Sequence, residues 1–196
     1  MSMELWQFPV IFTVGVVAGV INTLAGGGSL ITLPVLIFPG LPTTVANGTN
    51  RLAITVQSVL AVTGLKGTVQ YDGGMTCLSR SRRTASMLVF FFIGVYGGFI
   101  QAGIGFLIIA VLTTISGLNL VETNSHKVFI VGVNAFFTLI VFIFNSKICW
   151  PIGLALAAGN GLGGWIGSHL SVTKGERFIK LILAICVVGM VVKLLI

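Results

Sequence analysis

Six apolar segments, separated by short polar links, follow one another along the chain. They span residues 10–38, 44–64, 86–116, 122–144, 151–170 and 178–196. Four of these segments have about the 20 residues that a helix needs to cross the hydrocarbon core of a bilayer. The first and third are longer, with 29 and 31 residues, and both contain glycines near the middle. Each long segment is therefore either one strongly tilted helix or two shorter helices that meet at a break.

The composition places these segments in a membrane. The chain is 56% hydrophobic and 8% charged, with a mean hydropathy of +1.09, whereas soluble domains carry about 25% charged residues. The 11 Lys and Arg residues, which give a net charge of +7, lie mostly at the ends of the apolar segments. Contact with lipid headgroups and retention of loops in the cytoplasm explain this charge better than nucleic-acid binding does. We therefore expect a single membrane domain that comprises residues 1–196.

A triple glycine at residues 26–28 lies in the middle of the first long segment. In hydrocarbon no water satisfies free backbone groups, so irregular backbone at this depth is tolerated only where protein or a watery cavity supplies partners. We interpret the triple glycine as a helix break. For the scattered glycines of the third segment, Gly94, Gly97 and Gly98, tight contact between helices is the favoured interpretation.

The distribution of basic residues indicates how the third segment crosses the membrane. The links at residues 73–85 and 171–177 are rich in Lys and Arg, and such loops tend to stay in the cytoplasm. Residues 86–116 and two ordinary spans, 122–144 and 151–170, lie between these links. The links therefore lie on the same side of the membrane only if residues 86–116 cross it an even number of times, as a hairpin or re-entrant helix pair does. The same reasoning applied to residues 10–38 puts the N-terminus outside.

The two long segments resemble each other. A shift of 79 positions places Gly15 opposite Gly94, Val16 opposite Val95, Gly19 opposite Gly98, Asn22 opposite Gln101, and Gly26 opposite Gly105. At a shift of 76, the polar triplet at residues 49–51 falls opposite the triplet at 125–127, and each triplet ends in a cation. Together with the even number of crossings, this pattern predicts inverted repeats, a plan common among secondary transporters.

The sequence therefore predicts an all-α integral membrane protein with two homologous, inverted repeats, each of which contains a glycine-broken or re-entrant helix pair. Repeat 1 spans residues 8–72, a link spans 73–85, and repeat 2 spans 86–196. Glycine interruptions in matching places of two repeats indicate a binding site near the bilayer midplane.

The motifs around the first break are specific enough to suggest a family. The run GVINTLAGGGSLITLP at residues 19–34, followed by ANGTNRL at 46–52, resembles the sulfite exporter TauE/SafE family, also called the toluene sulfonate uptake permease family. In the second half, GLNL at residues 117–120, TNSHK at 123–127 and KICWPIG at 147–153 agree with this resemblance. It implies a multi-pass permease of the bacterial inner membrane for sulfite, sulfonates or other small sulfur-containing anions.

The chain departs from the family pattern in one respect. In family members the first repeat continues after the position of Asp72 with two more spanning helices, as the second half of this chain does. In this chain, a short polar link leads directly into repeat 2. Repeat 1 is therefore expected to lack its last two helices. Helix faces that would pack against the missing pair meet either lipid or a second copy of the chain. The small-residue face at residues 159–167 suits such self-association.

Small oxyanions bind well to backbone N–H groups at helix N-termini, and a mid-membrane break creates such termini. Arg51 has a planar fork that suits oxyanion oxygens, and Lys127 with His126 is its counterpart in the second half. The candidate residues for binding a small anionic substrate surround the two breaks and the two triplets. They are Asn22, Gly26, Gly27, Gly28, Ser29, Thr49, Asn50, Arg51, Gln101, Gly103, Gly105, Ser125, His126 and Lys127.

Simpler roles exist for several of these residues. Arg51 is seven residues into its segment, so it can also extend to the headgroups without contacting a substrate. Lys127 can pair at the membrane interface, and His126 can be an ordinary hydrogen-bonded polar residue. Asn22 and Gln101 can hydrogen-bond between helices only.

Enzyme functions are disfavoured. The four carboxylates lie at segment ends or in links, so no pair is placed for acid–base catalysis or metal binding, and the three cysteines lack metal-like spacing. No phosphate-binding lysine follows the triple glycine, which argues against an ATP-driven pump. We therefore expect a secondary permease without cofactor or metal. The alternative is a shortened, non-transporting relative that acts as a membrane subunit or scaffold, and a channel is a weaker third interpretation.

Overall fold

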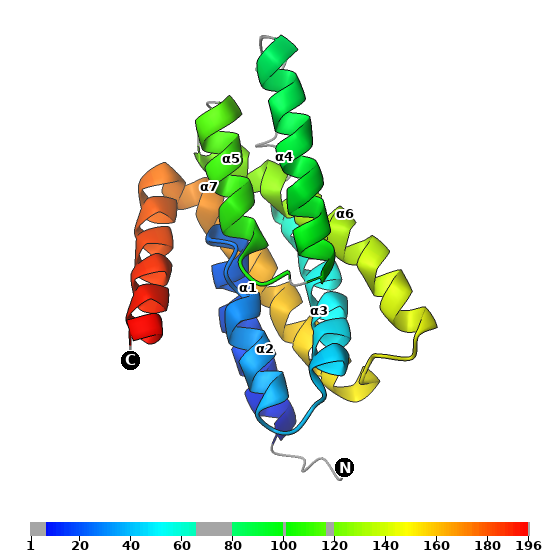
Figure 1. Ribbon diagram of the computed structural model, residues 1–196. Coiled ribbons are helices and arrows are strands. Elements are labelled where there is room, and N and C mark those ends of the chain that lie inside the picture. Colours follow the sequence, from blue (N-terminus) through cyan, green and yellow to red (C-terminus); the bar gives the residue numbers. More distant parts are fainter. Residues whose placement is uncertain (1–6, 66–79, 100, 117–119, 196) are drawn as a thin grey trace.

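The computed structural model describes residues 7–65, 80–99, 101–116 and 120–195, and all regular structure in these ranges is helical. The helices are α1 (Gln7–Leu24), α2 (Ser29–Ile37), α3 (Thr43–Gly64), α4 (Arg80–Phe99), α5 (Ile104–Ser116), α6 (Leu120–Phe144) and α7 (Trp150–Leu195) (Figure 1). The element α7 comprises two helices that meet at Gly175, where φ is 69° and ψ is −165°, so the last two predicted segments form separate helices with a sharp turn between them (Figure 1). The link predicted at residues 171–177 is present but shorter than predicted, because only Gly175 has a non-helical backbone and its neighbours are helical.

Both long apolar segments are broken into two helices, as predicted. The first break lies between Leu24 and Ser29, and the second lies between Phe99 and Ile104. Gly26 in the first break and Gly103 in the second have φ values of 87° and 76°, a left-handed conformation that glycine adopts at little cost. The chain can therefore reverse direction at each break within a few residues.

The two halves run in opposite directions through the molecule. In Figure 1, α1 and α3 run from the end that holds the N-terminus to the opposite end, whereas α4 and α6 run the other way. The start of α4 and the kink of α7 lie at the same end, as the charge count requires. Which end faces the cytoplasm, and whether the halves arose by duplication, remain predictions. The predicted end of repeat 1 at residue 72 lies outside the described residues, and α4 begins within the predicted link, at Arg80.

The first part of α7 packs between α1 and α3. A Cβ atom placed on Gly163 or Gly159 would collide with the backbone carbonyls of Val16 and Phe12 on α1. Small residues allow helix backbones to approach this closely in membranes. The prediction that the face at residues 159–167 is free for self-association is therefore wrong, because its glycines are buried against α1 and α3 of the same chain.

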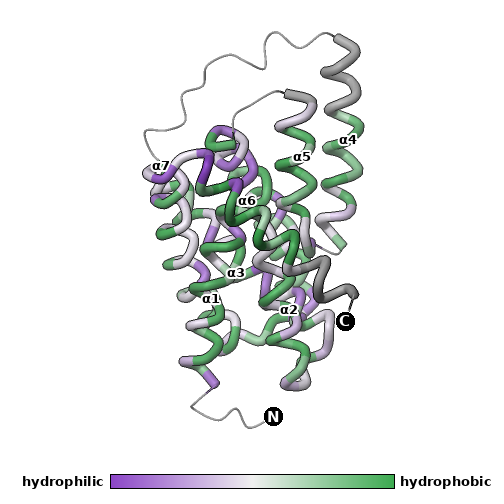
Figure 2. Tube along the Cα trace, turned by 90° about the vertical axis from the view of Figure 1, so that its left-hand side faces the viewer, coloured by the Kyte–Doolittle hydropathy of each residue, from purple (hydrophilic) through white to green (hydrophobic). Residues whose placement is uncertain are grey.

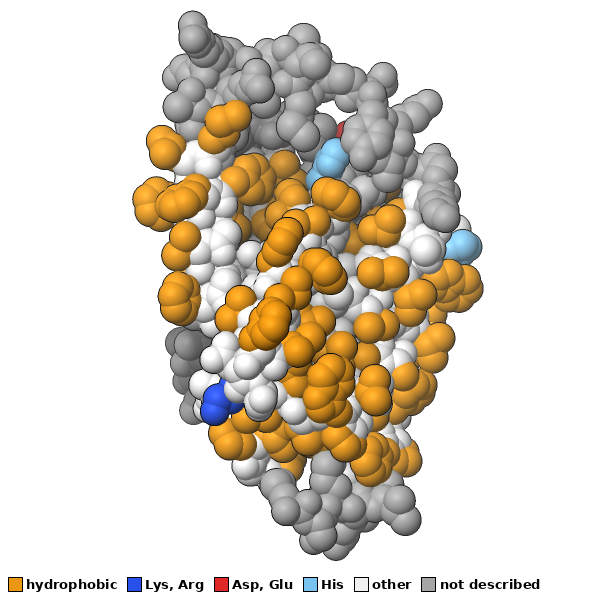
Figure 3. Space-filling view, turned by 90° about the vertical axis from the view of Figure 1, so that its right-hand side faces the viewer, with side chains coloured by type: hydrophobic (Ala, Val, Ile, Leu, Met, Phe, Trp, Pro, Cys, Tyr) orange, Lys and Arg blue, Asp and Glu red, His pale blue; other side chains and the backbone are white. Residues whose placement is uncertain are grey.

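The outer surface is apolar, as in a protein that contacts lipid. Two helices, α1 and α6, are long and apolar enough to cross a membrane, and the ranges Met87–Phe99 and Ile104–Thr114 are shorter apolar helices. Figure 2 shows hydrophobic stretches along the helices, and Figure 3 shows hydrophobic side chains spread over much of one face. Phenylalanines of α6 account for part of this surface, with Phe129 and Phe137 each 64% exposed. A soluble protein would bury such side chains.

Candidate functional site

The two helix breaks meet inside the molecule. Gly26 of the first break and Gly105 at the start of α5 touch through their backbones, and a Cβ atom on either glycine would collide with the other. Glycine is therefore required at both positions for the halves to pack. As a result, the N-terminal ends of the short helices α2 and α5 lie beside each other.

Arg51 on α3 contacts the end of α4. Its side chain is fully buried, and Nη2 donates hydrogen bonds to the carbonyl oxygens of Gly97 at 2.7 Å and Gly98 at 2.9 Å. Nη1 donates to the side-chain oxygen of Asn134 at 3.3 Å. The carbonyls of the last helical turn have no partner within their helix, and the helix dipole makes this end negative. Arg51 therefore caps the C-terminus of α4 and does not extend to the headgroups.

Lys127 on α6 does the same for α1. It is 1% exposed, and Nζ donates to the carbonyl oxygens of Thr23 at 2.6 Å and Asn22 at 3.2 Å, in the last turn of α1. Lys127 is thus buried in the interior and is not an interfacial lysine. Each half of the chain supplies the cation that caps the broken helix of the other half.

Two amide side chains that were not among the predicted site residues support these capped ends. Gln57 on α3 accepts a hydrogen bond from Asn22 at 3.0 Å and donates to the hydroxyl of Thr23 at 3.0 Å. Asn134 on α6 donates to the carbonyl oxygen of Gly94 at 3.4 Å, in addition to accepting from Arg51. A glutamine inside an apolar segment, six residues after a buried arginine, was the available sequence signal for Gln57.

Several buried donors near the breaks have no partner among the described residues. They include Nδ2 of Asn50, Nε of Arg51 and Nε2 of Gln101, and the acceptor Oε1 of Gln101 also has no partner. Gln101 is 2% exposed and has a φ of 60°, which is unusual for a residue other than glycine. The backbone N–H groups of residues 27–29 also make no hydrogen bond with a described residue. Buried polar groups normally have partners, so this concentration of free donors calls for an explanation.

The family model of the sulfite exporter TauE/SafE family matches residues 11–78 and 71–194, which is nearly the whole chain. The chain belongs to the TauE/SafE family. Its family is one of membrane transporters and not of enzymes.

Curated relatives agree with this assignment. The probable membrane transporter protein of Haemophilus influenzae is 25% identical over 223 positions, which cover 87% of this chain and 88% of the relative. The probable membrane transporter protein ORF9 of Sinorhizobium is 25% identical over 240 positions, which cover 94% of this chain and 91% of the relative. The probable membrane transporter protein YfcA of Escherichia coli K12 is 25% identical over 238 positions, which cover 95% of this chain and 88% of the relative. Because this chain has 196 residues, the last two relatives contain at least 44 and 42 residues without a counterpart here. No solved structure matches the chain.

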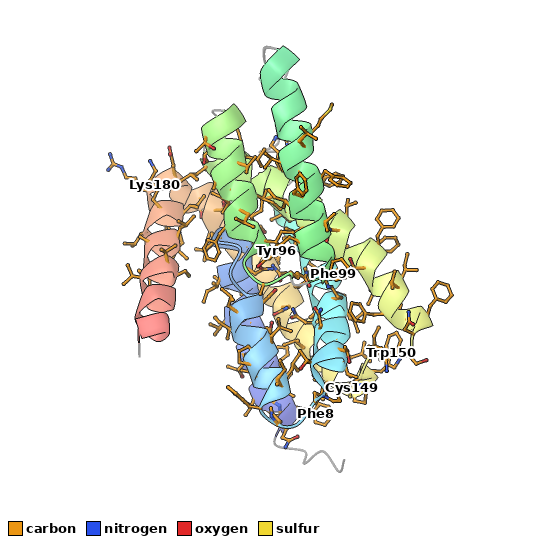
Figure 4. All side chains as sticks on the ribbon, in the orientation of Figure 1. Phe8, Tyr96, Phe99, Cys149, Trp150 and Lys180 are labelled. Carbon is orange, nitrogen blue, oxygen red and sulfur yellow. The ribbon has the colours of Figure 1, made fainter. Side chains whose placement is uncertain are left out.

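Other predicted site residues of this TauE/SafE chain do not lie at the junction of the breaks. The hydroxyl of Thr49 accepts a hydrogen bond from the backbone N–H of Cys149 at 3.0 Å, and so anchors the link between α6 and α7. Figure 4 shows Cys149 near one end of the molecule, whereas Phe99 lies at the second break. Ser125 donates to the carbonyl oxygen of Val121 in its own helix at 3.1 Å, and His126 is half-buried.

Asn50 links the first triplet to the first break. Its side-chain oxygen accepts a hydrogen bond from the hydroxyl of Thr32, in the first turn of α2, at 2.8 Å. Ser29, at the start of α2, is 4% exposed. The structure thus brings Asn50, Arg51 and Ser29 close to the breaks and assigns Thr49 to a structural contact.

Proposed function

We propose that this TauE/SafE chain is a multi-pass secondary permease of the inner membrane for small sulfur-containing anions such as sulfite or a sulfonate. The anion binds where the two helix breaks meet, near the bilayer midplane. The observation that carries the proposal is the contact between Gly26 and Gly105, which places two helix N-termini together beside buried donors without partners.

The electrostatics of the junction favour an anion. The negative C-terminal ends of α1 and α4 are already capped by Lys127 and Arg51. The N-terminal ends of α2 and α5 carry partial positive charge, and no carboxylate is among the buried side chains of the described residues. An oxyanion supplies the acceptors that the free N–H groups and the amide of Gln101 lack.

The arrangement of the halves fits alternating access. The broken pair α1–α2 returns to the end of the molecule that holds the N-terminus, and the pair α4–α5 returns to the opposite end (Figure 1). In transporters with inverted repeats, motion of one repeat against the other exposes a midplane site to each side in turn. We propose that the two halves here are such repeats.

One observation favours a second candidate function. The residues that the two relatives hold in excess, at least 44 and 42, are enough for about two spanning helices. Their absence is what a shortened membrane subunit or scaffold would show. A scaffold folds but does not bind or move anions, so a binding and transport assay separates the two candidates.

The test measures anion binding and uptake with purified protein. Sulfite and methanesulfonate are expected to raise the thermal unfolding temperature, and proteoliposomes are expected to take up radiolabelled sulfite. Gln101→Gly removes the free amide and suits the positive φ, so the protein should fold. Loss of one donor to a charged ligand costs about 1.5–3 kcal/mol, which corresponds to affinity that is weaker by about ten- to a hundredfold.

The matched control is Asn145→Ala, which removes an exposed amide beyond the end of α6. It should leave binding and uptake unchanged. Uptake no faster than in protein-free vesicles, together with no anion-dependent change in unfolding temperature, would refute the permease and favour the scaffold. If the Gln101→Gly protein binds sulfite with the same affinity as the unaltered protein, the junction of the breaks is not the binding site.

A further inference from the structure

Two pairs of glycines occupy corresponding places on α1 and α4. Gly15 and Gly19 precede the first break, and Gly94 and Gly98 precede the second at the same spacing. On α1 this pair forms a notch into which α7 fits. A Cβ atom on Gly19 would lie 2.5 Å from the carbonyl oxygen of Asn160, so the two backbones are in close contact.

No described residue fills the matching notch on α4. A Cβ atom placed on Gly94 or Gly98 would meet no atom within 4 Å, whereas one on Gly97 would collide with Ile104 of α5. Within the described part of the chain, the prediction of tight helix contacts is therefore wrong for Gly94 and Gly98 and correct for Gly97. The α4 face that carries the notch points away from the rest of the chain, and Phe91 and Val95 on it are 66% and 47% exposed.

A hollow of about 540 Å³ adjoins this notch. Its walls come from α3, α4 and α6 and include Thr44, Asn47, Gly98, Phe137 and Phe142. The side-chain oxygen of Asn47 is buried without a hydrogen-bond partner. At the corresponding place in the first half, beside Gly19, the space is filled by α7. The face of α4 and α6 is therefore shaped to receive a helix that none of the described helices supplies.

The missing length agrees with this interpretation. The two parts of the chain that match the family model overlap at residues 71–78, shortly before α4 begins. The 44 and 42 additional residues of the two longer-aligned relatives are enough for about two spanning helices. In the second half the helix α7 follows α6 and covers α1 and α3. A corresponding pair after α3 would cover α4 and α6.

We propose that a second copy of the chain occupies this face, with α4 of one protomer crossing α4 of its partner at Gly94 and Gly98. Association of helices in lipid depends on close backbone packing through small residues spaced four apart, which is what this notch offers to itself. Among the described helices, the other glycine-rich face, on α7, already packs against α1. The contact is symmetric, since the same patch serves both protomers.

Lipid is a poorer occupant of the same face. An acyl chain can cover the phenylalanines of α4 and α6, but it offers no hydrogen bond to Asn47 or Thr44 in the hollow. It also has no backbone that gains from the notch. A partner helix provides this close backbone contact.

The first experiment measures association of the full chain in lipid vesicles, by energy transfer between labelled copies at a series of protein-to-lipid ratios and without any anion. A double variant, Gly94→Leu with Gly98→Leu, fills the notch at positions where the protomer has open space, so its thermal stability should not change. Association should weaken by about tenfold. The control is Gly189→Leu on α7, which also adds a side chain in open space and should have no effect.

A second experiment does not depend on the double variant. With the three native cysteines replaced, Val95→Cys on α4 should cross-link rapidly between copies in membranes. Val17→Cys on α1, a position of similar exposure at 50%, should not. A protein that is monomeric at every lipid ratio, a dimer unaffected by the double variant, or equal cross-linking at the two positions would overturn the proposal. Because no anion is present, the outcome is independent of the proposed transport function.

Discussion

Replacement of Lys127 by methionine tests whether this buried cation is part of the architecture or is reserved for a substrate. Methionine has a similar length and removes only the charge and the hydrogen bonds. If Lys127 waited for an anion, its removal would relieve the cost of burying an ammonium group, and the anion-free protein would become more stable. If it caps α1, the carbonyls of Thr23 and Asn22 lose their donor, and the protein becomes less stable.

The structure allows the size of the effect to be estimated. Two hydrogen bonds from a charged donor contribute about 1.5–3 kcal/mol each, so their loss costs about 3–6 kcal/mol. Relief of the buried charge returns about 2.5–3.5 kcal/mol on insertion scales. The difference spans about −0.5 to 3.5 kcal/mol. Its midpoint is a net destabilisation of about 1.5 kcal/mol, which corresponds to a fall in unfolding temperature of about 3–6 °C for a chain of this size.

The assay is thermal unfolding of the purified protein in lipid nanodiscs without added anion, followed by tryptophan fluorescence. Lys147→Met serves as the matched control, because Lys147 is exposed in the link after α6, and its unfolding temperature should not change. An unfolding temperature for Lys127→Met that equals or exceeds that of the unaltered protein would refute the capping argument.

Further predictions follow from the same contacts and are checked by the same unfolding assay. Gln57→Leu removes the amide that bonds to Asn22 and to the end of α1, and should destabilise the protein by about 1–3 kcal/mol; a neutral result would contradict the role assigned to Gln57. Gly26→Ala should prevent folding, because its Cβ would collide with Gly105. Gly103→Ala meets only a side chain at 3.9 Å, so it should cost only the left-handed strain of about 1–2 kcal/mol. Equal effects of the two alanine variants would show that the breaks are not in contact.

The helix breaks were predictable from the sequence because they depend on local rules. An apolar run of 29 residues is longer than one upright span, and three consecutive glycines within it mark the place where the helix is interrupted. The even number of crossings by residues 86–116 followed from the basic links on either side. Both inferences use residues that are near each other in the chain, and the structure has both broken helix pairs.

The partners of the buried cations were not predictable in this way. Arg51 bonds to Asn134, 83 residues away, and Lys127 bonds to Asn22, 105 residues away. A cation within an apolar segment indicates a buried partner but does not reveal whether that partner is a ligand or a helix end. The sequence favoured a ligand for Arg51 and left the role of Lys127 open, whereas the structure shows both cations bonded to backbone carbonyls. The empty notch on α4 was equally hidden, because Gly94 and Gly15 have the same local pattern and differ only in what packs against them.

The reciprocal caps make each half dependent on the other. In isolation the first half would bury Arg51 without acceptors and would leave the last carbonyls of α1 without Lys127. Each defect costs several kcal/mol in hydrocarbon, since a charge at the bilayer centre alone costs at least about 2.5–3.5 kcal/mol. The second half brings Lys127 to the end of α1, and its own broken helix, α4, ends at Arg51. Both contacts form together because the second half runs in the opposite direction to the first. The opposed direction of the two halves and the exchange of cations are therefore one structural requirement, and a change that reverses one half must also remove both caps.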